Sequence, residues 1–203
     1  LYLDHAATTP LDPAVADCMS RVQAEVFANP SSPHAAGRRA RRIVDEAREQ
    51  ILADLGCPTA RLIFTSGATE ANHLATLGLA HAGDPLRLAV SLRDHESLRL
   101  AAAASGDTTT LATLPLLPSG RLDQQAVAAW LEQAYGDAAP ARLLATTLVC
   151  GQTGSVEDLP GLVRLLAAAA ADCLLHTDAT QAVGRLPVDF YDLGVTSLCF
   201  APH

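Results

Sequence analysis

The chain has 203 residues, of which 49% are hydrophobic and 18% charged, a composition typical of a globular domain rather than a disordered segment. Its formal net charge of −8 argues against nucleic acid as a partner, because nucleic-acid binding requires a basic surface. No apolar run reaches the roughly 20 residues that a membrane-spanning helix needs, and the first residues lack the basic start of a signal peptide.

Short apolar runs alternate along the chain with longer segments whose apolar residues recur every three or four positions. The short runs predict strands and the longer segments predict helices. The predicted strands are 62–64, 86–91, 109–114, 143–149, 173–177 and 195–200, and the predicted helices are 38–55, 68–82, 95–104, 123–135 and 159–170.

This alternation predicts an α/β fold, in which a mostly parallel sheet carries helices on both faces. The opening of the chain is instead rich in turn-forming residues. We therefore expect residues 1–14 to associate with a separate, smaller domain and residues 15–203 to form the sheet domain.

The cysteine pattern predicts a reducing, cytoplasmic environment. The five cysteines show neither CxxC spacing nor the spacing of a disulfide framework. The seven histidines form no HExxH or HxxxH pair, so we expect no metal site.

Ligands of an open parallel sheet bind at the carboxyl ends of the strands, so the residues after each predicted strand are candidates. After the run 62–64 comes a turn of small residues that opens a helix at Ala68 and Thr69. Free backbone N–H groups at such a helix start can bind a phosphate, and Thr69 adds a hydroxyl. The alternative is an ordinary turn between a strand and a helix.

Three further candidates follow other strands. His95 could stack on a cofactor or transfer protons, or it could be an exposed residue beside a helix cap. Asp178 ends a strand expected to be buried, where a carboxylate is costly unless a cation pairs with it, although it could instead cap a helix. Gln181 could reach the same pocket. Together these residues fit a phosphorylated pyridinium cofactor.

Five stretches of the sequence resemble the cysteine desulfurase family. They read YLDHAATTPLDPAV, ANPSSPHAAGRRARR, IFTSGATEANHLA, DHESL and HTDATQAVGRLPVD. Members of this family are pyridoxal-phosphate (PLP) enzymes of the class V aminotransferase group with the fold-type I architecture. The resemblance extends along the whole chain, but it covers only the N-terminal part of the longer family polypeptide.

The resemblance implies roles for the candidate residues. Ala68 and Thr69 would hold the cofactor phosphate, and His95 would stack on the pyridine ring and take part in catalysis. Asp178 would pair with the ring nitrogen, and Gln181 would hydrogen-bond the phenolic oxygen of the cofactor.

The resemblance also implies roles for residues outside this group. His203 would lie beside the phosphate, directly before the lysine that forms the Schiff base. Asn29 and His34 would lie near the entrance of the active site. All 14 basic residues of the chain are arginine. We therefore expect the segment to be inactive by itself.

Two positions depart from the family pattern. The family usually carries an asparagine that contacts the phenolic oxygen, where this chain has Cys150 and Gly151, so this contact is either missing or made by Gln152. A phosphate-binding serine of the family corresponds here to Ala201, which weakens the expected phosphate site.

The function that the resemblance implies is conversion of L-cysteine to L-alanine, with the sulfur leaving through an enzyme persulfide. The sulfur would enter iron–sulfur cluster assembly or thio-modification pathways through an acceptor protein, and the enzyme would be a homodimer. The catalytic cysteine and the arginine that binds the substrate carboxylate would lie beyond this stretch. The alternatives are a selenocysteine lyase, a cysteine β-lyase and an inactive scaffold of the same fold.

Overall fold

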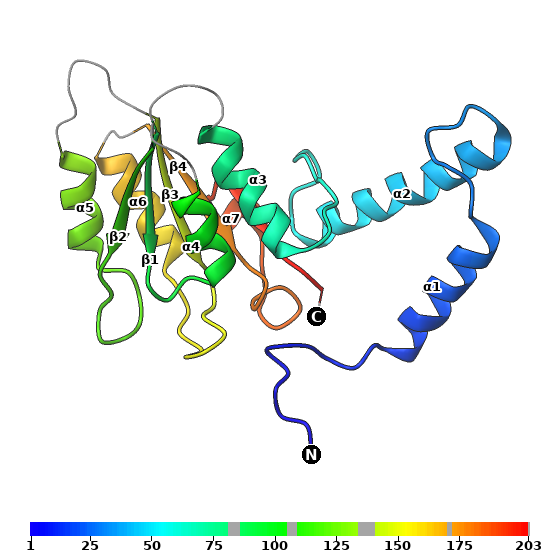
Figure 1. Ribbon diagram of the computed structural model, residues 1–203, viewed down its shortest axis with the longest axis horizontal. Helices are drawn as coiled ribbons and strands as arrows, with labels where there is room; N and C mark the ends of the chain where they lie inside the picture. Colours follow the sequence, from blue (N-terminus) through cyan, green and yellow to red (C-terminus); the bar gives the residue numbers. More distant parts are fainter. Residues whose placement is uncertain (81–85, 105–108, 134–140, 170–171, 203) are drawn as a thin grey trace. The chain divides into compact units, whose positions relative to one another are not determined.

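The computed structural model describes residues 1–80, 86–104, 109–133, 141–169 and 172–202 (Figure 1). The chain divides into two compact units, an N-terminal unit (Leu1–Ile63) and a sheet unit (Phe64–Pro202). This division follows residue 63, whereas the sequence predicted a boundary after residue 14. The association of residues 1–14 with a smaller domain stays a prediction. No helix in the described ranges is long and apolar enough to cross a membrane.

The N-terminal unit contains the helices α1 (Pro13–Glu25) and α2 (Ala35–Asp54). The sequence did not predict α1, although Asp12 caps it and Pro13 occupies its first turn, both of which favour a helix start. Helix α2 confirms the predicted helix 38–55 and begins one turn earlier, where the His34 ring accepts a hydrogen bond from the Gly37 amide.

Gly37 is buried where the loop 29–34 lies against the start of α2. A Cβ atom at this position would lie 2.3 Å from the Ser32 carbonyl oxygen and 2.8 Å from the Asn29 carbonyl oxygen. Both distances are far below van der Waals contact, so only glycine permits the observed approach of loop and helix.

We predict that Gly37→Ala destabilises this loop by about 1–3 kcal/mol, because the added methyl group overpacks the contact. Hydrogen exchange of the backbone amides from 29 to 40 in the full-length protein measures the effect. Gly78→Ala is the matched control, since nothing lies within 4 Å of its Cβ position and alanine there favours the helix by up to about 1 kcal/mol. Equal protection in the Gly37→Ala variant and the wild type would contradict this account.

The sheet unit contains five parallel strands in the order β2-β1-β3-β4-β5. They are β1 (Leu86–Ser91), β2 (Thr109–Leu114), β3 (Ala141–Thr147), β4 (Cys173–Asp178) and β5 (Ser197–Cys199). The helices of this unit are α3 (Ala68–Ala80), α4 (Glu96–Ala103), α5 (Gln124–Glu132), α6 (Leu159–Ala168) and the short α7 (Phe190–Leu193), which was not predicted. The predicted helix ends at 82, 135 and 170 lie outside the described residues.

Helices cover both faces of the sheet, as expected (Figure 1). Successive residues of a strand point to opposite faces, so Leu88 and Ala89 of β1 belong to different clusters of buried side chains. The cluster with Leu88 includes Leu98 of α4, and the cluster with Ala89 includes Trp130 of α5 and Leu162 of α6. Burial on both faces explains why the strands read as continuous apolar runs.

The predicted strand 62–64 is wrong. These residues have no regular secondary structure, and the side chains of Ile63 and Phe64 are 60% and 51% exposed. A strand exists only where its backbone groups bond to a neighbouring strand, and no described strand pairs with this segment. The β-branched and aromatic residues of this segment therefore indicated a strand that the structure does not contain.

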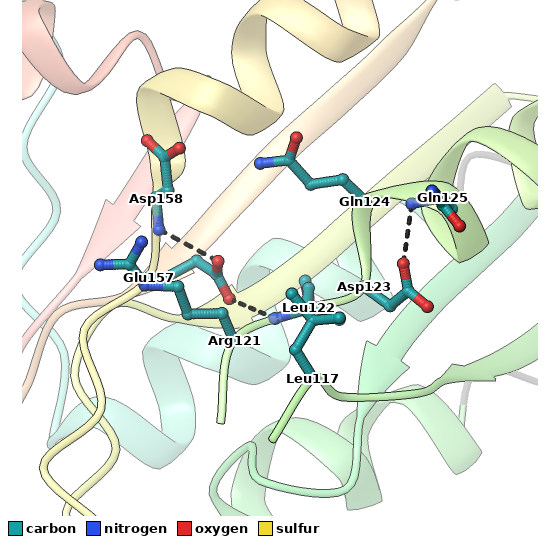
Figure 2. Close-up of a pocket in the computed structure, with 8 residues that line it drawn as sticks. All are labelled: Leu117, Arg121, Leu122, Asp123, Gln124, Gln125, Glu157 and Asp158. Atoms are coloured by element: carbon teal, nitrogen blue, oxygen red, sulfur yellow. Dashed lines mark hydrogen bonds between the residues drawn. The ribbon is translucent and has the colours of Figure 1, made fainter. Parts of the chain in front are cut away.

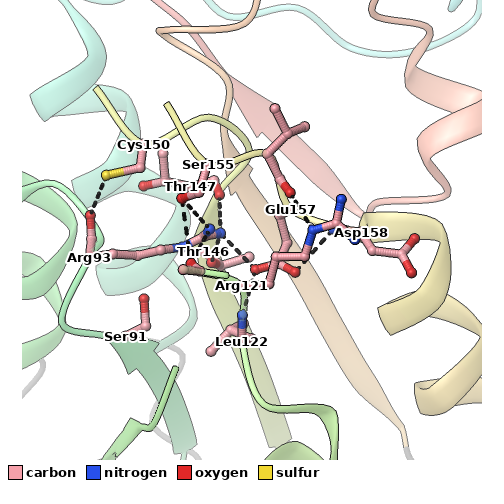
Figure 3. A network of polar contacts seen from close by, with 12 residues as sticks. Ser91, Arg93, Arg121, Leu122, Thr146, Thr147, Cys150, Ser155, Glu157 and Asp158 are labelled. Carbon is pink, nitrogen blue, oxygen red and sulfur yellow. Dashed lines mark hydrogen bonds and ion pairs between the residues drawn. The ribbon is translucent and has the colours of Figure 1, made fainter. Parts of the chain in front are cut away.

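A buried ion pair ties together the carboxyl ends of β1 and β3 (Figure 3). Arg93, just after β1, contacts the Glu157 carboxylate at 2.7 Å, and their side chains are 4% and 1% exposed. The same guanidinium donates to the carbonyl oxygens of Thr147 (2.7 Å) and Gly120 (2.8 Å). The Arg93 guanidinium thus binds acceptors on three segments, at Gly120, Thr147 and Glu157.

The neighbouring Asp94 joins the same two strands. Its carboxylate accepts hydrogen bonds from the Ser91 amide (2.6 Å) and hydroxyl (2.9 Å), and from the Thr147 amide (2.8 Å). Burial raises the pKa of Asp94 above its ordinary value, although these bonds and the nearby Arg93 favour the ionised form.

We predict that Glu157→Gln costs about 3–5 kcal/mol of unfolding free energy, because it leaves the buried Arg93 guanidinium without its counter-charge. Asp45→Asn breaks the Arg41–Asp45 pair, whose side chains are 62% and 44% exposed, and we expect it to cost less than about 1 kcal/mol. Urea unfolding followed by circular dichroism compares the two variants. A Glu157→Gln cost no larger than that of Asp45→Asn would show that the buried pair does not stabilise the fold.

Candidate functional site

Parallel pairing brings several predicted site residues to one edge of the sheet unit. The register sets Asp178 at the end of β4 opposite Thr147 of β3 and Cys199 of β5. His95 follows β1 and caps α4. The carboxyl ends of the strands therefore carry the polar side chains, as the fold class predicts.

Asp178 is only 3% exposed. One carboxylate oxygen accepts from the Thr180 amide at 3.0 Å, and the other accepts from the Asn72 side-chain amide at 2.8 Å. None of the three ion pairs in the part of the chain that the structure describes includes Asp178. This buried carboxylate therefore suits a cationic ligand group that would complete its coordination.

Asn72 of α3 was not singled out in the sequence, yet its fully buried side chain contacts four others. Its Nδ2 donates to Asp178 and to Ser97 Oγ (3.1 Å), and its Oδ1 lies 3.0 Å from both His176 Nε2 and Cys199 Sγ. No distinct sequence signal marked Asn72, because α3 also carries the polar residues Thr69, Glu70, His73 and Thr76. The partners themselves come from distant segments and could not be read from spacing.

His176 lies two residues before Asp178 in β4 and is 1% exposed. Its Nδ1 is 2.8 Å from the Ser197 hydroxyl. Burial lowers the pKa of His176 to about 4, against the opposing charge of Asp178. The ring is therefore neutral near pH 7.

His95 occupies the N-cap position of α4, so the cap alternative describes its local geometry. Its Nδ1 accepts from the Ser97 amide at 3.1 Å and lies 2.8 Å from the Ser97 hydroxyl. The residue itself is exposed, which leaves the ring accessible to a ligand. Its stacking and catalytic roles stay predictions.

Ala68 and Thr69 are the first two residues of α3, as expected for a helix start. The Glu70 carboxylate accepts from the Ser66 amide (2.6 Å) and hydroxyl (2.7 Å), and these bonds lower the pKa of Glu70. A carboxylate thus already uses one N–H group of this turn. Phosphate binding by Ala68 and Thr69 stays a prediction.

Gln181 adjoins the loop that carries the family departures. A Cβ atom at Gly151 would lie 3.4 Å from Gln181 Cγ, so these two segments are in direct contact. Gln152 is exposed in the same loop, whereas Cys150 is buried. Burial raises the pKa of the Cys150 thiol, but hydrogen bonds from Thr153 and from the Gln152 amide, with the charge of Arg93, outweigh burial and lower it.

The other predicted site residues are Asn29, His34 and His203. Asn29 and His34 belong to the N-terminal unit, where Asn29 Oδ1 accepts from the Ser31 amide at 2.8 Å. Their position at an active-site entrance stays a prediction. His203 lies outside the described residues, and Ala201 is half-buried.

A pocket of about 450 Å³ lies at the start of α5 and α6 (Figure 2). It contains none of the predicted site residues. Its carboxylates already accept backbone hydrogen bonds, since Asp123 and Asp158 cap the two helices and Glu157 accepts from the Leu122 amide at 3.0 Å. We therefore interpret its polar groups as structural. Within the described ranges, no group of three or more His, Cys, Asp or Glu residues could hold a metal ion.

The depressed pKa of His176 predicts a pH-dependent stability. The unfolded chain protonates this ring near pH 6.5 and the folded chain only near pH 4, so stability falls as pH decreases between these values. Protonation of His176 in the unfolded chain lowers the free energy of unfolding by up to about 1.4 kcal/mol for each pH unit in this range. Urea unfolding of the wild type and of His176→Gln at pH 7, 6 and 5 measures it, because the difference between the two proteins cancels the contributions of other groups. Parallel pH profiles would refute the assignment.

Comparison with known proteins identifies the family. The family model for aminotransferase class-V matches residues 1–203. The chain is 36% identical over 214 residues to a cysteine desulfurase of Frankia sp. (strain EuIK1), covering 100% of the chain and 49% of that relative. It is 32% identical over 231 residues to a selenocysteine lyase of Homo sapiens, covering 100% of the chain and 51% of that relative. The chain thus spans about half the length of the curated relatives it matches.

Solved structures share the same fold. The X-ray structure of a NifS-like protein from Rickettsia africae ESF-5 matches with a TM-score of 0.88 and 24% identity, covering 100% of this chain and 54% of that one. A structure described as SspA in complex with cysteine matches with a TM-score of 0.86 and 27% identity, covering 100% of this chain and 57% of that one. These structures confirm the fold class. The family model and the curated relatives confirm the resemblance to cysteine desulfurases, and the chain belongs to the aminotransferase class-V family.

Proposed function

We propose that the protein carrying this chain binds PLP at the carboxyl edge of the sheet unit and converts L-cysteine to L-alanine. The observation that carries this proposal is the buried Asp178 carboxylate, which has two hydrogen-bond donors and no cation among the described residues. A protonated pyridine nitrogen is the cation that would complete this site.

The residues at this edge suit the different parts of the cofactor. Asp178 would keep a proton on the ring nitrogen, His95 would contact the ring face and Gln181 would donate to the phenolic oxygen. Ala68 and Thr69 would hold the phosphate at the start of α3. When bound, PLP supplies an electron-withdrawing ring that stabilises negative charge at the substrate α-carbon.

Other groups complete the proposed machinery. The chain contains no lysine, and we propose that the full-length protein supplies the Schiff-base lysine that the family resemblance implies. The sulfur would pass through a cysteine persulfide to an acceptor protein that serves iron–sulfur cluster assembly or thio-modification. We also propose a cytoplasmic homodimer. The second candidate function is selenocysteine lyase, because a relative with that activity is 32% identical to the chain.

The cofactor role of Asp178 is testable in the full-length protein. We predict that Asp178→Asn lowers kcat/KM for L-cysteine by about 10²–10³-fold, because the ring nitrogen loses its anionic partner. Asp123→Asn is the matched control, since asparagine caps a helix as well as aspartate and this residue lies outside the site. Near-wild-type kcat/KM in Asp178→Asn would overturn the proposed role.

The products distinguish the candidate reactions. Alanine and a protein persulfide from L-cysteine support the desulfurase, whereas pyruvate would identify a β-lyase. Turnover of L-selenocysteine but not of L-cysteine would identify a selenocysteine lyase. A full-length protein that retains no absorption band of an internal aldimine, after incubation with PLP and removal of the unbound cofactor, would favour the inactive scaffold.

A further inference from the structure

The side chain of Asn72 joins two site residues that approach from different strands. Its Nδ2 contacts the Asp178 carboxylate at 2.8 Å and Ser97 Oγ at 3.1 Å, and its Oδ1 contacts His176 and Cys199. An amide group has two hydrogens to donate and two lone pairs to accept with, so these four contacts use its full capacity.

These partners leave one orientation for the amide. An ionised carboxylate only accepts hydrogen bonds, so the NH₂ group must face Asp178 and the oxygen must face His176. Nε2 of His176 must then carry the hydrogen that it donates to Asn72. Its Nδ1 accepts from the Ser197 hydroxyl at 2.8 Å, which agrees with a neutral ring.

Asn72 is also connected to His95, through hydrogen bonds to the Ser97 hydroxyl. Ser97 Oγ accepts from Asn72, which directs its own hydrogen toward His95 Nδ1 at 2.8 Å. The Ser97 amide donates to the same nitrogen at 3.1 Å. Nδ1 is therefore an acceptor, and Nε2 is the nitrogen that carries the ring proton.

The bonds that Asn72 makes are shielded from water, because this residue has no exposed surface. In such a place each lost bond leaves a buried polar group unpaired, so alternative arrangements are disfavoured. Ser97 and Asp178 lie 25 and 106 positions after Asn72 in the sequence, so only the fold joins them.

We propose that Asn72 is a positioning residue, which fixes the Asp178 carboxylate and the His95 ring together through this hydrogen-bonded chain. It thereby sets how strongly Asp178 holds a proton on the ring nitrogen of the ligand. The inference rests on the proposed function for the identity of that ligand, whereas the hydrogen-bonded chain itself does not.

The first test uses the full-length protein loaded with PLP that carries ¹⁵N in its ring. The nitrogen chemical shift reports whether the ring is protonated. We expect a protonated ring in the wild type, a partly deprotonated ring in Asn72→Leu, and a loss of PLP affinity of roughly 10- to 100-fold, the effect of removing a hydrogen bond to a charged group. An unchanged nitrogen shift and affinity in Asn72→Leu would overturn the proposal.

Thr76→Val is the matched control for a polar-to-apolar change in the same helix. Thr76 is fully buried one turn after Asn72, and its hydroxyl bonds only to carbonyl oxygens of α3 among the contacts that the structure describes. We expect it to leave the ring nitrogen shift unchanged, which separates positioning from a general loss of stability. A shift as large in Thr76→Val as in Asn72→Leu would contradict the positioning role.

The second test uses the full-length protein without cofactor and follows the histidine ring nitrogens by NMR. We expect His176 to be the Nε2–H tautomer in the wild type and to lose this preference in Asn72→Leu. If Asn72→Leu fails to fold, Ser97→Ala breaks only the arm to His95, and should change the His95 signals while leaving those of His176 unchanged. An Nδ1–H tautomer at His176 in the wild type would overturn the hydrogen-bonded chain.

The two tests separate this proposal from the proposed function. If the wild type does not bind PLP but its tautomers respond to Asn72→Leu as expected, the proposed function fails and the hydrogen-bonded chain stands. If the wild type binds PLP and neither the ring nitrogen nor the tautomers respond, the positioning role fails and the proposed function stands.

Discussion

The rest of this structure depends on one constraint: polar and charged groups that are buried at the carboxyl edge of the parallel sheet need partners inside the protein. Three charged side chains, Arg93, Asp94 and Glu157, are buried there together with Asp178. Each must find partners inside the protein, because a buried group without hydrogen bonds costs more than most single contacts contribute. Arg93 pairs with Glu157, and Asp94 accepts hydrogen bonds from the Ser91 and Thr147 amides, which holds the strand ends in place.

Asp178 has different hydrogen-bond partners, and this difference is why we propose a ligand-binding role for it and a structural role for Glu157. Glu157 meets a guanidinium, whereas Asp178 meets only an amide side chain and a backbone N–H among the described residues. The Asn72 amide keeps the carboxylate oriented without neutralising its charge. An aspartate held in this way is prepared to interact with a cationic ligand group.

The departure from the family pattern at Cys150 and Gly151 affects one side of the candidate site. Cys150 is buried against the Arg93 carbonyl (Figure 3). Gly151 lies beside Gln181. These changes alter the surroundings of the residue expected at the phenolic oxygen. The bonds among Asn72, Asp178 and His176 do not involve this loop, which is why this departure leaves the centre of the candidate site intact.

The sequence by itself determined the alternation of elements, the parallel α/β sheet with helices on both faces, and the candidates at the strand ends. These follow from local periodicity, from the rule that parallel strands present their carboxyl ends at one edge, and from motif resemblance. The tertiary structure decided that 62–64 is not a strand, because pairing requires a neighbour that composition cannot reveal. It also decided that Asn72 and His176 join the site, since a buried amide selects its partners by proximity in space, and these partners are far apart along the chain.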